Sequence, residues 1–249
     1  MKLLPKRLER PPLVEAIFEL RFASERESVG DLLPGLLYRN LQSSYERVEA
    51  LPLANVPREI REKDPNLKYL PSRQFSGGSR RILVGDHVVA ISQRRPYEGW
   101  HSFRDHIIGL ATYLKDTDLI QNVERYSLKG LNVVPSSQGG QLGLLNAKFE
   151  IEGRPAPEKG FHFRTEIESG ELLIIVEIAP NATVQYPDQE QPTGLLISVD
   201  GIGIVTSTSE FWVQSPNEID ELHDCVKRHF FGLLTSDALE VLGPIWPPR

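Results

Sequence analysis

Cysteine is nearly absent from this sequence, since Cys225 is the only one among 249 residues. A single cysteine excludes an intramolecular disulfide and a metal cage built from cysteines. Long hydrophobic runs are missing too: the longest purely aliphatic stretch is the five residues Leu172–Val176, whereas a membrane-spanning helix needs about 20. The chain starts with MKLLPKRLERPP, which has charges and prolines where a secretory signal needs an apolar run of about seven or more. We therefore expect a cytoplasmic protein.

The composition is that of an ordinary globular protein. Charged residues make up 25% of the chain and apolar residues 40%, which excludes disordered, collagen-like and coiled-coil chains. A chain of this length buries about 70–75% of its unfolded surface, so its core needs no disulfide or metal.

Charge is unevenly distributed along the chain. Residues 1–135 carry 21 Lys and Arg against 17 Asp and Glu, a balance of +4, whereas residues 136–249 carry 7 against 17, a balance of −10. This pattern indicates either a solvated surface with an acidic end or a dipolar protein that presents one electrostatic face to a partner. Nucleic acid is an improbable partner, because its binders usually carry a basic stripe on a basic domain.

Alternating apolar and polar residues predict three half-buried strands, at 14–22, 145–152 and 161–168. Two β-rich runs that flank Gly85-Asp86 predict a hairpin over 80–93. Further strands are expected at 67–74, 123–134 and 171–178. The stretch 194–206 is either one more strand or a tight hairpin that turns at Asp200-Gly201.

Helical spacing of apolar residues predicts three amphipathic helices, at about 32–47, 101–116 and 216–233. The third has the clearest start, because Ser215-Pro216-Asn217-Glu218 matches a capping box with proline at the first helical position. A short helix at about 236–242 is expected to end at Gly243 and Pro244.

These elements predict an α+β fold with mostly antiparallel, curved sheet packed against three amphipathic helices, similar to a helix-grip fold. Strands follow one another through short turns and do not alternate with helices, which argues against a doubly wound parallel sheet. We expect a single domain over 1–249; the linker-like stretch 134–143 leaves a division into two lobes as the alternative.

The densest group of chemically interesting side chains lies in QRRPYEGWHSFRDH, residues 93–106. Arginine forks bind phosphate or carboxylate, and aromatic faces stack on bases or cations. We predict that the contacts to a partner or ligand come from Arg94, Arg95, Tyr97, Trp100 and Arg104. The competing interpretation is structural, with Trp100 filling the edge of the core and Arg104 on a solvated helix face.

Other candidate sites are weak. His101 with Asp105, and Cys225 with His229, are spaced one helical turn apart, but neither pair has a third metal ligand at a fixed spacing. The carboxylates on the polar face of 161–168 are typical of any solvated strand. We therefore expect no catalytic residue, no metal and no cofactor.

The chain resembles a known family in three segments: PPLVEAIFELRF at 11–22, VGDHVVAISQRRPYEGWHSFRDHI at 84–107 and IDELHDCVKRHFFGLLTSDAL at 219–239. This is the sporadically distributed family of uncharacterised prokaryotic proteins of about 250 residues. In that family the last helix typically has a histidine near its start and ends in a phenylalanine before a Thr-containing turn. The matching positions here are His223, Phe230 or Phe231, and Thr235. The resemblance implies no catalytic residues, and the family's patchy distribution is similar to that of genes in defence or toxin–antitoxin loci.

We therefore expect a non-enzymatic protein that acts through contacts with another protein, in a bacterial defence or toxin-neutralising module. One alternative is a pocket between sheet and helices for a small anionic ligand, with Arg94, Arg95 and Trp100 at its mouth. A second alternative is a nucleic-acid-associated factor that uses the basic first half, and a third is a hydrolase without local motifs. Assembly into a homo-oligomer is also compatible with the sequence.

Overall fold

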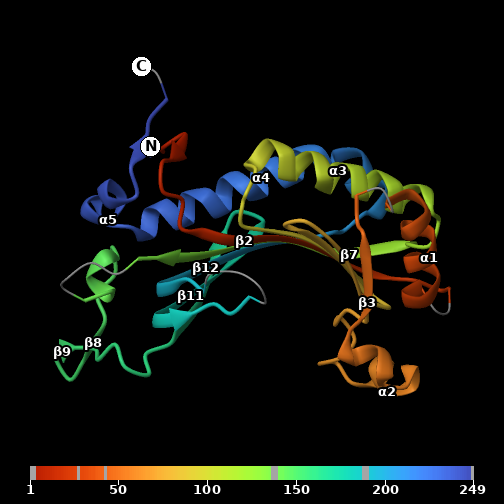
Figure 1. Ribbon diagram of the computed structural model, residues 1–249, viewed down its shortest axis with the longest axis horizontal. Coiled ribbons are helices and arrows are strands. Elements are labelled where there is room, and N and C mark those ends of the chain that lie inside the picture. Colours follow the sequence, from red (N-terminus) through yellow and green to blue (C-terminus); the bar gives the residue numbers. More distant parts are fainter. Residues whose placement is uncertain (1–3, 27–28, 42–43, 136–139, 187–190, 248–249) are drawn as a thin grey trace. The chain divides into compact units, whose positions relative to one another are not determined.

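The computed structural model describes residues 4–26, 29–41, 44–135, 140–186 and 191–247, and it is α+β with five helices and a large antiparallel sheet (Figure 1). The predicted fold class is therefore confirmed at this level. The chain divides into two compact units. Unit 1 comprises Met1–Val14, Lys129–Gly201 and His223–Arg249, and unit 2 comprises Glu15–Leu128 and Ile202–Leu222.

Unit 2 contains residues 15–23 of β2 and 122–128 of β7, and the strands in it are hydrogen-bonded in the order β7-β2-β6-β5-β4-β3. Their bounds are Asn122–Val134, Leu13–Ala23, Val88–Arg94, Arg80–Val84, Arg73–Gly77 and Arg47–Ala50. The alternation read from 14–22 is confirmed, because Phe18, Leu20 and Phe22 of β2 are buried and the residues between them are half-buried. The hairpin at Gly85-Asp86 is confirmed as well, with Val84 paired to Val89 across β5 and β6.

Helices α1 (Val29–Leu41), α2 (Arg58–Lys63) and α3 (Trp100–Asp116), with a 3₁₀ turn at Pro52–Asn55, also belong to unit 2. The whole apolar stripe expected of the 101–116 helix is buried on α3: Phe103, Ile107, Leu110, Ala111 and Leu114. The expected end of the first helix at 47 is wrong. The helix stops at Leu41, and Arg47–Ala50 instead forms strand β3, because its backbone pairs with β4 through Arg47 and Ser76.

The predicted strand at 67–74 is also wrong for most of its length, since β4 begins only at Arg73. Residues 65–69 form turns. Tyr69 holds this segment in place: its ring lies under the Arg21 guanidinium, 4.6 Å from the centroid, and its hydroxyl donates to Glu124 Oε2 at 2.7 Å. These side-chain contacts come from β2 and β7, so local alternation could not reveal them.

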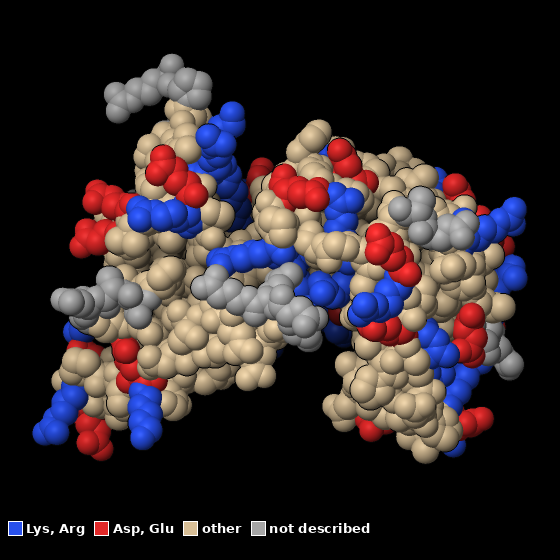
Figure 2. Space-filling model, in the orientation of Figure 1, with Lys and Arg blue, Asp and Glu red and all other residues tan. Residues whose placement is uncertain are grey.

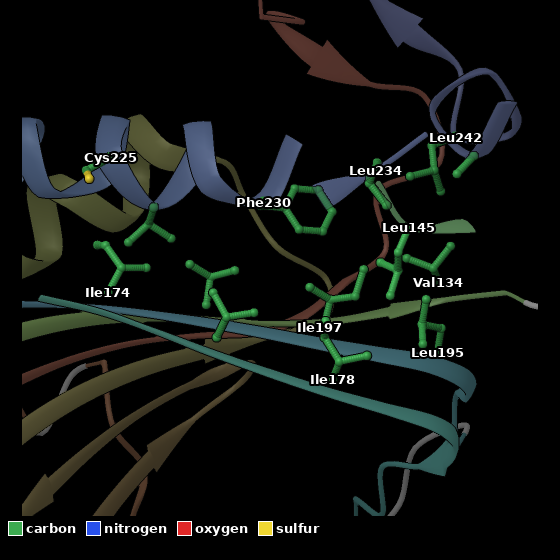
Figure 3. Close-up of a cluster of buried hydrophobic side chains, with 14 residues drawn as sticks. Val134, Leu145, Ile174, Ile178, Leu195, Ile197, Cys225, Phe230, Leu234 and Leu242 are labelled. Carbon is green, nitrogen blue, oxygen red and sulfur yellow. The ribbon is translucent and has the colours of Figure 1, made fainter. Parts of the chain in front are cut away.

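Unit 1 contains strands in the order β10-β11-β12-β7, with β10 at Phe163–Ser169, β11 at Leu172–Thr183 and β12 at Thr193–Ile204. The predicted strand 161–168 is confirmed as β10, antiparallel to β11. Strand β12 is continuous, so the tight hairpin at Asp200-Gly201 is not formed. Figure 3 shows inward side chains such as Ile174, Ile178 and Ile197 packed against Cys225 and Phe230 of the last long helix.

The predicted strand at 145–152 is wrong. Only Glu150–Ile151 is a strand (β8), paired with Arg154–Pro155 (β9), and Leu142–Leu144 is a 3₁₀ turn. Asn146 instead bonds to the end of a helix. Its backbone N–H donates to Leu233 O at 2.8 Å, and its side-chain amide donates to Gly232 O and Leu234 O at 3.2 and 2.6 Å. The segment therefore supplies donors to the last carbonyls of that helix.

Residues Val134–Pro135 and Gly140–Gly143 lie within unit 1, and 136–139 lie outside the described residues. A division into lobes at 134–143 stays a prediction.

Helix α4 covers Thr208–Leu233, with Thr208–Leu222 in unit 2 and the rest in unit 1. The predicted capping box at Ser215 is wrong, because the helix starts eight residues before Pro216, which lies inside it. The first turn is instead capped by Ser207, whose Oγ accepts from Glu210 N at 3.4 Å. The short last helix is confirmed as α5 (Ser236–Val241), capped by Thr235 and followed by Gly243 at φ 67°. Strands β1 (Arg7–Leu8) and β13 (Pro244–Ile245) pair nearby.

Glycine at position 203 is required by a close approach in unit 2. A Cβ on Gly203 would lie 2.3 Å from Cζ of the Tyr126 ring, which itself stacks on Phe211 at 5.2 Å between centroids. The packing of this ring therefore explains the glycine at 203.

None of the helices in the described parts of the chain is both long and apolar enough to span a membrane.

Candidate functional site

The first two predicted contact residues lie at the end of β6. The Arg94 guanidinium forms an ion pair with Glu15 on β2, with Nε 3.3 Å from Oε1, and both side chains are mostly buried. Arg95 follows in the loop and is exposed. The two arginines thus have different environments: one is held against the sheet and the other faces solvent.

Tyr97 and Trp100 flank the buried ring of Phe103 at the start of α3. Both pack edge-on against it, with centroid distances of 6.1 and 6.5 Å. Burial raises the pKa of the Tyr97 hydroxyl well above its usual range. Both aromatic rings therefore contact the buried core at the start of α3.

Asp220 on α4 joins two of the predicted residues. Its Oδ1 accepts from Arg104 Nε at 2.7 Å and from Trp100 Nε1 at 3.3 Å. The hydrogen bond from Asp220 raises the pKa of the Arg104 guanidinium. Arg104 also donates to Pro216 O at 3.4 Å. The structure therefore brings Trp100 and Arg104 together in a joint between α3 and the first part of α4, and Tyr97 packs against Phe103 beside them.

A separate pocket lies between α1, α3 and strands β5 and β6, with a volume of about 220 Å³. Its hydrocarbon wall is formed by Leu37, Leu41, Ile82, Ile91 and Leu110. None of the five predicted contact residues is among the described residues that line it. Whether those five contact a partner or ligand stays a prediction.

Arg80 is the cation in this pocket, and its side chain is three-quarters buried. Its Nη1 hydrogen-bonds to His106 Nε2, and its Nη2 pairs with Glu98 Oε2. The buried Nε has no hydrogen-bond partner among the described residues. Two of the five N–H bonds of the guanidinium are thus accounted for by neighbours.

The contacts of His106 fix its tautomer. A guanidinium can only donate, so Nε2 of His106 must accept from Arg80. The ring proton is then on Nδ1, which donates to Ser102 O at 2.7 Å. A neutral imidazole beside Arg80 leaves the positive charge of the guanidinium in the pocket.

The polar part of the lining also includes Asn40, Ser44, Tyr45, Asp105 and Tyr113. Burial raises the pKa of the Tyr45 hydroxyl to about 12, although the positive charge of Arg80 opposes this shift. Tyr45 therefore keeps its proton at neutral pH and can donate. The Asp105 carboxylate is largely exposed, and it pairs with His101 at 3.7 Å.

Glu98 lies on the solvent side of Arg80. Its Oε2 also accepts from Ser102 Oγ at 2.8 Å. That hydrogen bond and the one from Arg80 lower the pKa of this exposed carboxyl, so Glu98 is charged at neutral pH.

The two candidate metal pairs have no additional ligands nearby. Across the described ranges of the chain, no three metal-binding side chains gather at one place. Cys225 is buried and its thiol donates to Ser169 Oγ at 3.4 Å, while burial lowers the pKa of His229.

No protein-family model matches this chain, and a comparison with curated proteins found no match. The assignment of a function therefore depends on the pocket and the surfaces themselves.

Sequence reasoning missed Arg80 and Tyr45. In β5, Arg80 and Arg81 are consecutive, so they lie on opposite faces of the strand. Apolar residues follow on both faces, so the sequence does not indicate which arginine faces inward. Tyr45 was assigned to the apolar face of a helix that ends before it.

Proposed function

We propose that this protein binds a small anionic ligand, without catalysis, in the pocket between α1, α3, β5 and β6. One observation supports this most strongly: the Arg80 guanidinium lies in the wall of an otherwise mainly apolar pocket of about 220 Å³. Ligand sites are typically concave and apolar with a few polar groups that fix orientation. In such a setting a charged hydrogen bond is stronger than in water.

The neighbours of Arg80 support the same function. His106 accepts a hydrogen bond from Arg80, so it brings no negative charge into the pocket that would neutralise the guanidinium. Tyr45 keeps its proton and supplies a second hydrogen-bond donor for an anion. Three N–H bonds of the guanidinium remain beyond those directed to His106 and Glu98.

The finer form of the fold belongs to this proposal. A curved sheet gripped by the amphipathic helices α1, α3 and α4 would place ligand sites between strands and helices, as in helix-grip proteins. The position of the Arg80 pocket between helices α1 and α3 and strands β5 and β6 agrees with that expectation.

The test is calorimetric titration of the purified protein with a panel of small carboxylates and phosphates that carry hydrocarbon groups. We expect at least one to bind, and Arg80→Gln to weaken it by tenfold or more. Arg81→Gln is the matched control, because Arg81 is adjacent in β5 but points to the other face, and it should leave affinity unchanged. Absence of any binding, or equal binding by Arg80→Gln, would contradict the proposal.

A protein partner is the second candidate, and α1 favours it. Leu32, Leu36 and Tyr38 are 51%, 42% and 50% exposed on this helix, which is unusual for large apolar residues on a helix surface. Figure 2 shows acidic and basic side chains interspersed over the part of unit 2 that carries α1 and α2. A partner at α1 would therefore be held mainly by apolar contact, in a defence module or as a second copy of the chain.

A double variant Leu32→Glu, Leu36→Glu tests the second candidate. It should abolish self-association or partner capture in cross-linking from native cells while leaving the melting temperature unchanged. Capture that survives the two charges would exclude α1 as the interface.

A further inference from the structure

We infer that the occupant of the Arg80 pocket is a monocarboxylate with a compact branched or aromatic hydrocarbon body. The inference rests on the proposed function and names the chemical class of the ligand. Three properties of the pocket support it: the charges around it, the absence of a helix start in its lining, and its size.

The charges around the pocket favour a single negative charge on the ligand. Arg80 is the cation among the described lining residues, His106 is neutral, and the carboxylates of Glu98 and Asp105 lie beside or within the same lining. A phosphate monoester carries about −1.5 to −2 charges at neutral pH, so it would meet two carboxylates with one guanidinium to balance it. A carboxylate carries one charge and matches the planar fork of arginine.

The helix that walls the pocket does not add a phosphate site. Its lining residues, from Asp105 to Tyr113, lie within α3 and beyond its first turn. Their backbone N–H groups are used inside the helix, whereas phosphate sites commonly use the free N–H groups of a helix start.

The volume limits the hydrocarbon part. The pocket holds about 220 Å³, below the roughly 300–1,000 Å³ typical of sites for drug-sized ligands. Leucine and isoleucine side chains form one wall, and the rings of Tyr45 and Tyr113 form another part. A benzene ring or a branched chain of four or five carbons suits these surfaces, and a long acyl chain does not.

Gly109 provides a way to test the hydrocarbon space without changing a polar group. It lines the pocket from α3, and a Cβ added to it would meet no atom within 4 Å. Gly109 is exposed, so a leucine at this position has room to cover the open side of the pocket, and the helical backbone gains helix propensity.

The experiment titrates the full-length protein at neutral pH with four probes: benzoate, isovalerate, phenyl phosphate and benzamide. We expect benzoate or isovalerate to bind, and phenyl phosphate and the neutral benzamide to bind at least tenfold more weakly. Gly109→Leu should weaken the carboxylate by tenfold or more. Gly143→Leu is its matched control, because Gly143 is also open to an added Cβ but lies in unit 1.

The outcomes separate the ligand class from the anion site itself. If phenyl phosphate binds as tightly as the carboxylates or more tightly, and Arg80→Gln abolishes this, the monocarboxylate inference is overturned and the anion-binding proposal stands. If benzamide binds as well as benzoate, or no probe binds at millimolar concentration, both are overturned. If the carboxylates bind equally to Gly109→Leu, whose melting temperature shows that it folds, the pocket is not their site.

Discussion

At the scale of single residues, Asp220 is a carboxylate that holds two neighbouring side chains in a structural contact. It accepts from the Trp100 indole and from the Arg104 guanidinium, two of the residues that the sequence presented as contacts to a partner. Aromatic and arginine side chains are common both at interfaces and in such joints. The sequence alone could not choose between these roles, because the acceptor lies 116 residues beyond Arg104.

Asp220→Ala should therefore lower the free energy of unfolding by about 1–2 kcal/mol, since two donors lose a charged acceptor in a partly exposed setting. Chemical denaturation followed by tryptophan fluorescence measures this. The exposed neighbour Glu221 is the control, and Glu221→Ala should change stability by less than about 0.5 kcal/mol. Equal effects of the two substitutions would show that the joint contributes nothing specific.

Tyr45 gives the pocket a pH signature. Its pKa is about 12 in the folded protein and about 10 when unfolded. Between these values the unfolded chain loses a proton that the folded protein keeps, so stability falls as pH rises, by up to about 1.4 kcal/mol per pH unit. Below pH 10 the group has no effect.

Tyr45→Phe removes this titration. The difference in unfolding free energy between wild type and Tyr45→Phe should be constant from pH 7 to 9.5 and should then shift against the wild type as pH rises further. All other groups are the same in both proteins, so their contributions to the difference cancel. A difference that stays flat to pH 11.5 would mean that Tyr45 is not buried as described.

At the scale of elements, the sequence predicted the existence of most helices and strands but misplaced several ends. The start of α4 is the clearest example, because two segments match the Ser-x-x-Glu capping pattern: Ser207 to Glu210 and Ser215 to Glu218. Only the second, in which proline follows the serine, was identified from the sequence. In the structure Ser215 is buried inside the helix, and the first segment forms the cap.

Pro216→Ala distinguishes these two starts. Proline in a helix interior lacks the N–H that would bond to the carbonyl four residues earlier, at a cost of about 3 kcal/mol, and its rigidity in the unfolded chain offsets part of this. We therefore expect the alanine variant to be more stable by about 1–2 kcal/mol. At a first helical position the same change would be neutral or destabilising, so a loss of stability would contradict the described start of α4.

The false strand at 145–152 has a different origin. Apolar and polar residues do alternate in this segment, but Asn146 donates hydrogen bonds to three carbonyls at the end of α4. The two carbonyls that its side chain contacts are 86 and 88 residues away in sequence. Unpaired carbonyls at a helix end need donors, and that demand outweighed the local preference for a strand. Such long-range pairing has no local signal, whereas 161–168 pairs with the adjacent segment and was predicted correctly.

At the scale of the whole molecule, the same connection rule occurs in both units. In unit 2 the first strand, β2, is followed in the sheet by β6, β5, β4 and β3, and in unit 1 β7 is followed by β12, β11 and β10. In each case the last strand in sequence lies beside the first and leads into a long helix, α3 or α4. The two units therefore share an order of strand connections, although no repeat is visible in the residues.

The net charge of −6 leads to an expectation for nucleic acid. Binding to duplex DNA rests largely on phosphate neutralisation, and affinity falls by a factor of about 10³ or more between 50 and 200 mM salt for six phosphate contacts. We expect no complex with duplex DNA tighter than about 10⁻⁴–10⁻⁶ M at physiological salt, measured by fluorescence anisotropy. A salt-sensitive nanomolar complex with DNA or RNA would overturn both proposed functions.

The close approach of Tyr126 to Gly203 has an evolutionary consequence. Because the ring occupies the space of a Cβ at 203, the two positions are not free to drift independently among related chains. A side chain at 203 requires a small residue at 126, and a ring at 126 requires glycine at 203. In an alignment of related sequences, positions 126 and 203 should therefore covary: both residues are kept, or both are replaced together.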